Sequence, residues 1–215
     1  KEDELLFYEY DRDNLWYKGY LYNTESKEKK LIFDMSVNDD YNDPGELVMR
    51  KINNISTFLK KDDYIYFINN TGATPEGNLP FLIKMNLNTL KSDTLFKCNP
   101  KNSERIYGFT NEDLTKILIR SENQTTPREY FIYNLITKER TLVEKNENPY
   151  PEITNLRKEL IKYKRKDNVP LSGTLYYPMN YEEGKKYPLI IEAYPEEYTD
   201  ISTAGQVKAY PNTFI

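Results

Sequence analysis

The stretch LIKYKRKDNVPLSGTLYYP, residues 160–178, followed by KKYPLIIEAYP, residues 185–195, decides which fold the sequence predicts. Apolar and polar residues alternate on both sides of KDN, which is typical of two half-buried strands joined by a turn. Residues 187–195 then form an apolar run of the kind found in a strand that is buried on both faces. The end of the chain, residues 196–215, contains a glycine and is predicted as a loop.

The sheet of an α/β-hydrolase begins with the same succession of elements: a hairpin, one buried strand and a glycine-containing loop. Residues 159–215 are therefore predicted to be the first part of such a domain. Serine hydrolases of this fold need a histidine that takes the proton from the serine, and the sequence contains no histidine. We expect that the chain stops inside this domain and that residues 1–215 alone hydrolyse nothing by that route.

One pattern of strands repeats through residues 1–150, in units that begin at Asp3, Asp63 and Asp113. Each unit contains a strand, a loop, a second strand, a short polar turn and a third strand, all with alternating apolar residues. Further short strands are predicted before the second and third units, at 47–51 with 57–60 and at 106–110. A unit of antiparallel strands that recurs every 50 to 60 residues is typical of a β-propeller blade.

The predicted architecture is thus mainly β, with about three C-terminal blades of a partial propeller in residues 1–150. A β-sandwich is the structural alternative because it also contains short alternating strands, but it does not require a recurring unit. The segment NPYP, residues 148–151, interrupts the strand pattern. We therefore predict a linker at 151–158 and a domain boundary near Glu159.

Composition excludes several classes of function. The net charge of −4 and the pI near 5.2 disfavour a nucleic-acid partner, and no apolar run is long enough to span a membrane. The one cysteine, Cys98, has no histidine to activate it and is predicted to be a buried structural residue. No pattern indicates a metal or another cofactor, so we expect none.

Five segments resemble one family, the prolyl oligopeptidase class of serine peptidases, and most closely its glutamyl endopeptidase branch. The GATPEG-x-LPFL and AYP…AGQV…PN patterns within them are the most specific, and the five together cover about a third of the chain. The segments are DDYNDPGELVMRK (39–51), TGATPEGNLPFLIKMNLNT (71–89), DNVPLSGTLYYP (167–178), KKYPLIIEAYPEEY (185–198) and TAGQVKAYPNTF (203–214).

The resemblance implies a serine peptidase in which a propeller caps an α/β-hydrolase domain. The propeller would limit access to short or unfolded peptides, and the hydrolase domain would cleave them after Glu. The resemblance also implies that Tyr194 matches a family tyrosine whose hydroxyl donates to the oxyanion of the reaction. Two positions further on, this chain has Glu196 where the family usually has glycine or a basic residue. The nucleophile, base and acid of the family's catalytic triad are not in residues 1–215. The family resemblance implies a periplasmic or secreted protein, with the cytoplasm as the alternative.

Two groups of charged residues are further candidates. Asp39, Asp40, Asp43 and Glu46 do not have the spacing of an EF-hand loop, so we interpret 39–46 as a solvated loop with a Pro-Gly turn. Four basic residues are candidates for binding an acidic substrate side chain, because arginine matches a carboxylate well. They are Arg50, Lys51, Arg120 and Arg128, and Arg50 ranks first because it lies in a family-like segment.

The alternative function is a self-contained β-rich module that binds peptides or glycans through its tyrosines, of which there are 20. In the peptidase interpretation, the last strands would lack their helices. Leu189, Ile190 and Ile191 would then have an uncovered face. We expect either that the isolated chain self-associates or that its tail is disordered or packed on a neighbour.

Overall fold

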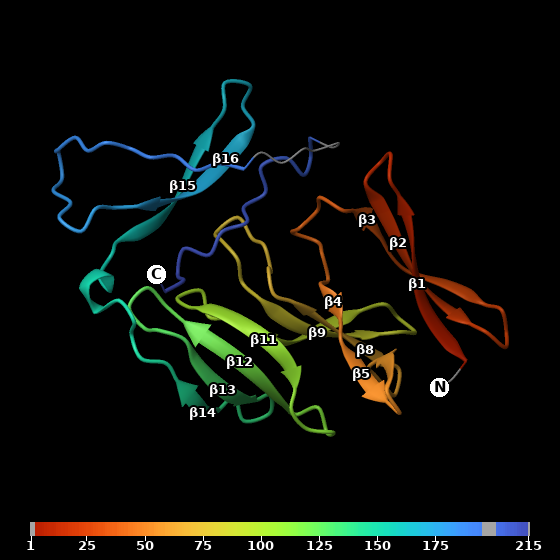
Figure 1. Cartoon of the computed structure of the whole chain (residues 1–215). Coiled ribbons are helices and arrows are strands. Elements are labelled where there is room, and N and C mark those ends of the chain that lie inside the picture. Colours follow the sequence, from red (N-terminus) through yellow and green to blue (C-terminus); the bar gives the residue numbers. More distant parts are fainter. Residues whose placement is uncertain (1–2, 195–200, 215) are drawn as a thin grey trace.

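The computed structural model describes residues 3–194 and 201–214, and it consists of antiparallel sheets joined by loops (Figure 1). The first sheet has the order β1-β2-β3. Alternating residues of the first predicted unit form these strands, so that unit is confirmed. The strands are β1 (Glu4–Asp11), β2 (Trp16–Asn23) and β3 (Lys29–Ser36).

The second sheet has the order β10-β9-β8-β4, with β7 also paired to β8, and the third has the order β11-β12-β13-β14. Three strands in each sheet come from the predicted second and third units, which are thereby confirmed. The bounds in the second sheet are β4 (Glu46–Leu47), β7 (Lys60–Lys61), β8 (Tyr64–Asn69), β9 (Phe81–Asn86) and β10 (Ser92–Lys97). Those in the third are β11 (Ser103–Phe109), β12 (Lys116–Glu122), β13 (Glu129–Asn134) and β14 (Arg140–Lys145).

The short strands predicted at 47–51 with 57–60 are largely confirmed, since Met49 and Arg50 pair with Phe58 and Thr57. Most of these residues form a separate hairpin, β5 (Met49–Ile52) with β6 (Ile55–Phe58), while β4 and β7 pair with β8. Asn53 and Asn54 at the hairpin turn both have positive φ, 49° and 64°. Two such residues in succession form the primed turn that joins tightly paired strands.

The three sheets stack face to face in chain order. One cluster of buried residues joins the first sheet to the second through Ile32 and Phe67, and another joins the second to the third through Leu82 and Ile119. The second sheet is therefore covered on both faces, which explains its nearly continuous apolar strands YIYFIN and FLIKMN. The mainly β fold class is confirmed, and the stacking is that of adjacent propeller blades.

Cys98 follows β10 and is buried, as predicted. Its Sγ lies 3.3 Å from the carbonyl oxygen of Asn99, and burial together with the nearby Glu104 carboxylate raises the pKa of the thiol. A thiol that stays protonated is a poor nucleophile.

We therefore predict that Cys98 does not react with a disulfide reagent such as Ellman's reagent in the folded chain. It should react fully after denaturation in guanidinium chloride, which serves as the positive control. Rapid reaction in native buffer, without a change in circular dichroism, would contradict the buried position of this thiol.

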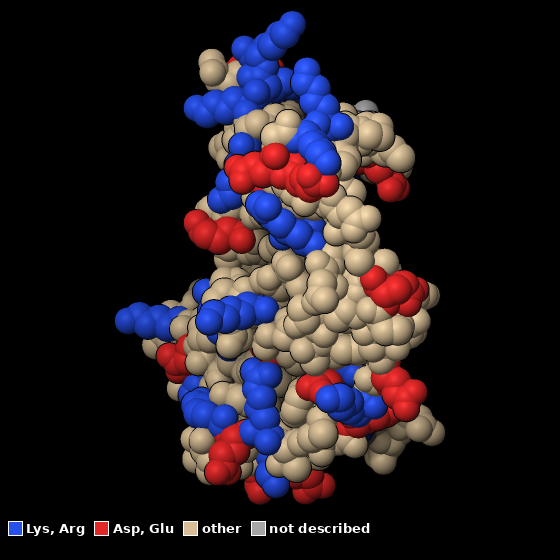
Figure 2. All heavy atoms as spheres, turned by 90° about the vertical axis from the view of Figure 1, so that its left-hand side faces the viewer, with Lys and Arg blue, Asp and Glu red and all other residues tan. Residues whose placement is uncertain are grey.

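The predicted hairpin at 160–178 is confirmed as β15 (Lys158–Lys164) and β16 (Pro170–Tyr176), which pair along their whole length. A short 3₁₀ helix, η1 (Pro151–Ile153), lies in the segment that was predicted as a linker. Basic side chains gather at the tip of the hairpin, at the top of Figure 2, where Lys162, Lys164, Arg165 and Lys166 are exposed.

The buried strand predicted at 187–195 is wrong for the residues that the structure describes. Residues 187–194 form no strand, and Leu189, Ile190 and Ile191 are 68%, 93% and 77% exposed. A central strand is stable only when neighbours satisfy its backbone on both edges, and no described segment pairs with this one. The predicted exposure of these three side chains is confirmed. Pro195 lies outside the described residues.

Among the described residues, no helix is both long enough and apolar enough to cross a membrane.

Candidate functional site

The end of the described chain crosses the loops at one end of the stacked sheets (Figure 1). We call residues 203–213 the strap. Its first half is bound by the loop between β3 and β4 through an ion pair and two hydrogen bonds to side chains. These contacts are Lys208 Nζ with Asp40 Oδ2 at 2.8 Å, Gln206 Nε2 donating to Asp39 Oδ1 at 2.9 Å, and the Val207 amide donating to Tyr41 Oη at 2.8 Å.

The second half of the strap is bound by the second sheet, the third sheet and β15. Most of these bonds use a strap carbonyl oxygen as the acceptor, so they depend on the path of the strap more than on its side chains. The bonds run from the Asn78 amide to Ala209 O at 2.8 Å, from Gln124 Nε2 to Pro211 O at 2.9 Å, from Asn212 Nδ2 to Pro100 O at 2.6 Å, from Tyr210 Oη to Asn70 O and from Lys158 Nζ to Thr213 O.

Gly205 allows the strap to pass close to the β15–β16 hairpin. Its φ is +77°, and a Cβ at this position would lie 2.0 Å from the carbonyl oxygen of Pro170. Any other residue would therefore be strained and would collide with backbone. From the sequence, this glycine was predicted only to be part of a loop. In the structure, it allows the backbone of the strap to lie against the backbone of the hairpin.

Two neighbouring asparagines at the end of β8 organise the loops below the strap. Asn69 is buried, its Oδ1 accepts hydrogen bonds from the amides of Thr71 and Gly72, and its Nδ2 donates to Asp43 O at 2.9 Å. Asn70 instead bridges to the third sheet. Its Oδ1 accepts from the Ile106 amide at 2.8 Å and its Nδ2 donates to the carbonyl oxygen of Ile106 at 3.1 Å.

The acidic loop at 39–46 binds the strap, a role that the sequence analysis did not predict. Burial opposes ionisation of Asp39, but hydrogen bonds from Gln206 and Asn42 outweigh it and lower the pKa of this carboxyl. Burial raises the pKa of Asp43. In residues 3–194 and 201–214, no group of acidic, cysteine or histidine side chains could hold a metal ion. One signal in the sequence could have indicated this contact: residues 39–51 and 203–214 both resemble the same family, and these two segments contact each other.

The four basic candidates divide into two pairs. Arg120 and Arg128 both bind Glu122, a nearly buried carboxylate, with nitrogen–oxygen distances of 3.4 and 3.3 Å. Both arginines are therefore already paired with an acidic side chain of the third sheet. Arg50 and Lys51 are exposed on β5, and neither forms an ion pair within the described residues.

Arg50 lies on a groove of about 970 Å³ between the segment 46–52 and strand β11. Asn70 lines the groove, and its carbonyl oxygen accepts a hydrogen bond from Tyr210 of the strap, so the strap contacts one residue of the groove wall. Figure 1 shows the β5–β6 hairpin at the lower edge of the molecule, away from the β15–β16 hairpin. Arg50 is therefore distant in the fold from the segment that carries Tyr194.

Tyr194 is 95% exposed at the end of the described segment. With Leu189 and Leu171, it lines a largely apolar hollow of about 1100 Å³ beside the β15–β16 hairpin. No hydrogen bond fixes its hydroxyl within the described part of the chain, and Glu196 lies outside that part. Its predicted contribution to an oxyanion site stays a prediction.

Comparison with known proteins agrees with the family resemblance. The chain is 31% identical over 235 aligned residues to a rice protein (Oryza sativa subsp. japonica) named probable glutamyl endopeptidase, chloroplastic, and the match covers 99% of the chain. The chain is homologous to part of the glutamyl endopeptidases. An Arabidopsis thaliana glutamyl endopeptidase of the same name is 32% identical over 203 residues, or 86% of the chain. The chain spans only 25% and 21% of these two endopeptidases.

No protein-family model matches the chain. Among solved structures, a putative dipeptidyl aminopeptidase IV from Bacteroides ovatus matches with a TM-score of 0.47 and 16% identity over 87% of this chain and 34% of that one. Oligopeptidase B from Leishmania major has a TM-score of 0.43 and 8% identity over 87% of this chain and 34% of that one.

Proposed function

We propose that this chain is part of a serine peptidase of the glutamyl endopeptidase branch, which cleaves peptides after Glu. The observation that carries the proposal is the identity of 31% to a protein of that name along nearly the whole chain. The stacked sheets up to β14 would form propeller blades above the active site, and β15 and β16 would open the hydrolase domain.

In this proposal, the chain's own catalytic group is Tyr194. A tyrosine hydroxyl can donate a hydrogen bond to the negative charge that develops on the substrate carbonyl oxygen. The exposed position of Tyr194 leaves its hydroxyl accessible to a substrate. The serine, histidine and aspartate would come from outside residues 1–215, because the chain has no histidine to act as the base.

The strap supports the proposal because it joins the two parts between which the substrate would be enclosed. It contacts the β3–β4 loop, the second and third sheets and the β15–β16 hairpin. For the location of the full-length protein, we keep the prediction from the family resemblance, which is periplasmic or secreted. The names of the rice and Arabidopsis relatives place those proteins in the chloroplast.

The proposal is tested with the complete gene product that contains this chain. We predict labelling by a fluorophosphonate probe, which reacts with activated serines, and cleavage of model peptides on the carboxyl side of Glu. Tyr194→Phe should lower kcat about 10²- to 10³-fold with little change in KM, because it removes one hydrogen-bond donor from the transition state.

Tyr163→Phe is the matched control, since Tyr163 is an exposed tyrosine on β15 to which the proposal gives no catalytic role. The isolated 215-residue chain should neither label nor cleave. A complete protein that neither labels nor cleaves would refute the peptidase assignment. A fall in kcat that is equal for the two variants would refute the role of Tyr194.

A further inference from the structure

The groove between β5 and β11 has the open space that a bound segment of chain requires. Strand β11 is at the edge of its sheet and pairs only with β12. The side chain of Asn70 already binds the backbone of Ile106 from the groove side, with one donor and one acceptor. Beyond it, a Cβ placed on Gly108 would meet no atom within 4 Å. Residues 105–109 of β11 line the groove, so the unpaired edge of this strand borders it.

Unpaired positive charge gathers on the walls of this groove. The chain has eight arginines, and Arg120, Arg128, Arg140, Arg157 and Arg165 each form an ion pair. Arg50 and Arg105 both line the groove, and neither forms an ion pair with a described residue. Lys51 follows Arg50 on the β5–β6 hairpin and adds a third positive charge, and residues 48–61 contain no acidic residue. The hairpin thus presents cations that no carboxylate of the described chain neutralises.

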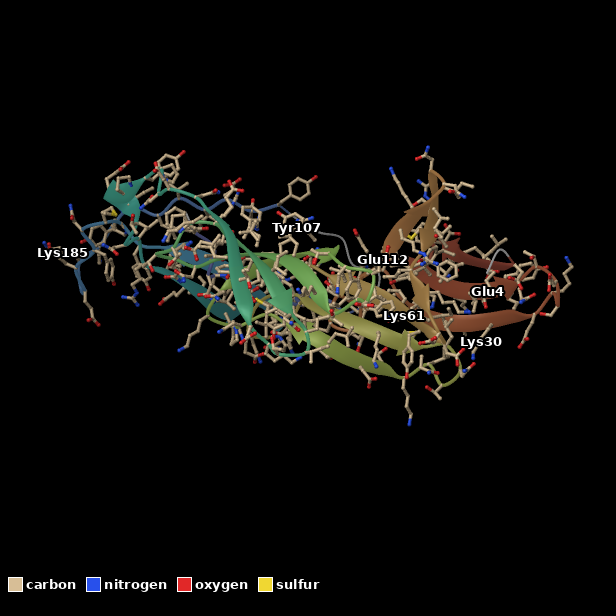
Figure 3. All side chains as sticks on the ribbon, turned by 90° about the horizontal axis from the view of Figure 1, so that it is seen from below. Glu4, Lys30, Lys61, Tyr107, Glu112 and Lys185 are labelled. Carbon is tan, nitrogen blue, oxygen red and sulfur yellow. The ribbon has the colours of Figure 1, made fainter. Side chains whose placement is uncertain are left out.

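The hairpin also exposes apolar side chains beside these cations. Met49, Ile52 and Ile55 are about half exposed or more, although they belong to a hairpin whose turn is fixed by Asn53 and Asn54. A rigid element with exposed apolar groups loses little conformational entropy when it binds a partner. Tyr107, half exposed on β11, offers a further aromatic surface to the groove (Figure 3).

Two acidic residues limit where a ligand can place negative charge. Glu46 lines the groove at β4, and Glu112 lines it in the loop after β11, where Figure 3 labels it. A ligand of uniform negative charge would meet these carboxylates. A peptide in which acidic and apolar residues alternate can instead place carboxylates at Arg50 and Arg105 and apolar side chains on the hairpin.

We propose that this groove binds an extended acidic peptide, with its carboxylates on Arg50 and Arg105 and its apolar side chains on the β5–β6 hairpin. This inference deepens the proposed function and rests on it for the ligand class. The groove extends from the hairpin to Asn70, which contacts the strap, so it would guide such a peptide from the lower edge of the molecule toward the strap. It assigns Arg50 to peptide capture, away from the scissile bond.

The test is a fluorescence anisotropy titration of this chain with a fluorescein-labelled decapeptide in which Glu alternates with Leu. Arg50→Glu and Arg105→Glu should each weaken binding about tenfold or more, because each replaces an attractive charge with a repulsive one. Glu112→Gln should strengthen binding, and raising the salt concentration should weaken it. The same peptide with Gln in place of Glu should bind at least about tenfold more weakly.

Arg12→Glu is the matched control, because it makes the same charge change on an exposed residue outside the groove. Equal binding by the Arg12→Glu, Arg50→Glu and Arg105→Glu variants, or by the Glu and Gln peptides, would overturn the proposal. Thermal melts verify that each variant is folded, and Arg50→Gln replaces Arg50→Glu if the latter is not. Peptide binding by the isolated chain does not require the catalytic triad. A lack of binding would therefore refute the groove proposal alone, whereas a lack of serine labelling in the complete protein would refute the proposed function.

Discussion

Replacing Phe67 with alanine is expected to lower the free energy of unfolding by about 3–5 kcal/mol. Phe67 is 1% exposed at the centre of the cluster that joins the first and second sheets. Its ring meets the edge of Phe33 at a centroid distance of 6.5 Å. The substitution removes apolar contacts and leaves a cavity that two stacked sheets cannot close without moving apart. Chemical denaturation followed by circular dichroism measures this loss.

Leu5→Ala is the control for Phe67→Ala, because Leu5 lies on β1 of the same pair of sheets and is 53% exposed. It should change the free energy of unfolding by about 0.5 kcal/mol or less. If the two variants unfolded at the same denaturant concentration, the first and second sheets would not share a packed core. Phe67→Leu should fall between them, since it keeps part of the buried volume.

Replacing Arg140 with alanine is expected to cost about 3 kcal/mol of stability, the lower end of the range for breaking a buried ion pair. The side chain of Glu104 is fully buried, and its Oε1 lies 2.5 Å from Arg140 Nη1. The Asn99 amide donates to the other oxygen at 3.1 Å. Without Arg140, the Glu104 carboxylate would stay buried with no positive partner. The lower end applies because Arg140 is itself 31% exposed, so water can partly replace it.

Arg165→Ala is the control for Arg140→Ala, because the Arg165–Asp167 pair is exposed on both sides at the tip of the β15–β16 hairpin. It should change the free energy of unfolding far less than Arg140→Ala does, because water replaces an exposed partner. The double variant Arg140→Ala, Glu104→Leu should recover much of the loss, since it removes the unpaired charge. Equal destabilisation by Arg140→Ala and Arg165→Ala would show that Glu104 is solvated.

Local pattern was enough to predict most of the strands. In β8 and β12, apolar residues occur at positions that the sheet faces bury, and turns with Lys27, Lys138 or Asn168 at positive φ join other pairs of strands. Such signals depend on residues close in sequence, and antiparallel strands joined by short turns need little else. The same reasoning failed at 187–194, where the apolar run has the composition of a strand but no partner among the described strands.

The candidate site depended much more on contacts between distant segments. Arg120 and Arg50 look alike in the sequence, yet Arg120 is neutralised by Glu122 and Arg50 is free within the described chain. The sequence predicts that the acidic loop at 39–46 is solvated, but residues 40 and 41 of this loop bind the strap, some 165 residues further along the chain. Which charge meets which partner is set by the stacking of the sheets, and the spacing of residues along the chain does not encode it.

The sequence by itself determined that the chain is a series of antiparallel units followed by a hairpin, because alternation and turn residues act locally. It also determined that the chain has no histidine for a serine triad. Tertiary structure alone decided that the strap joins the β3–β4 loop and the second and third sheets to the hairpin and that unpaired arginines gather on one groove. These features arise where segments far apart in the chain come together, and their energies depend on burial and on charge partners that only the packed molecule supplies.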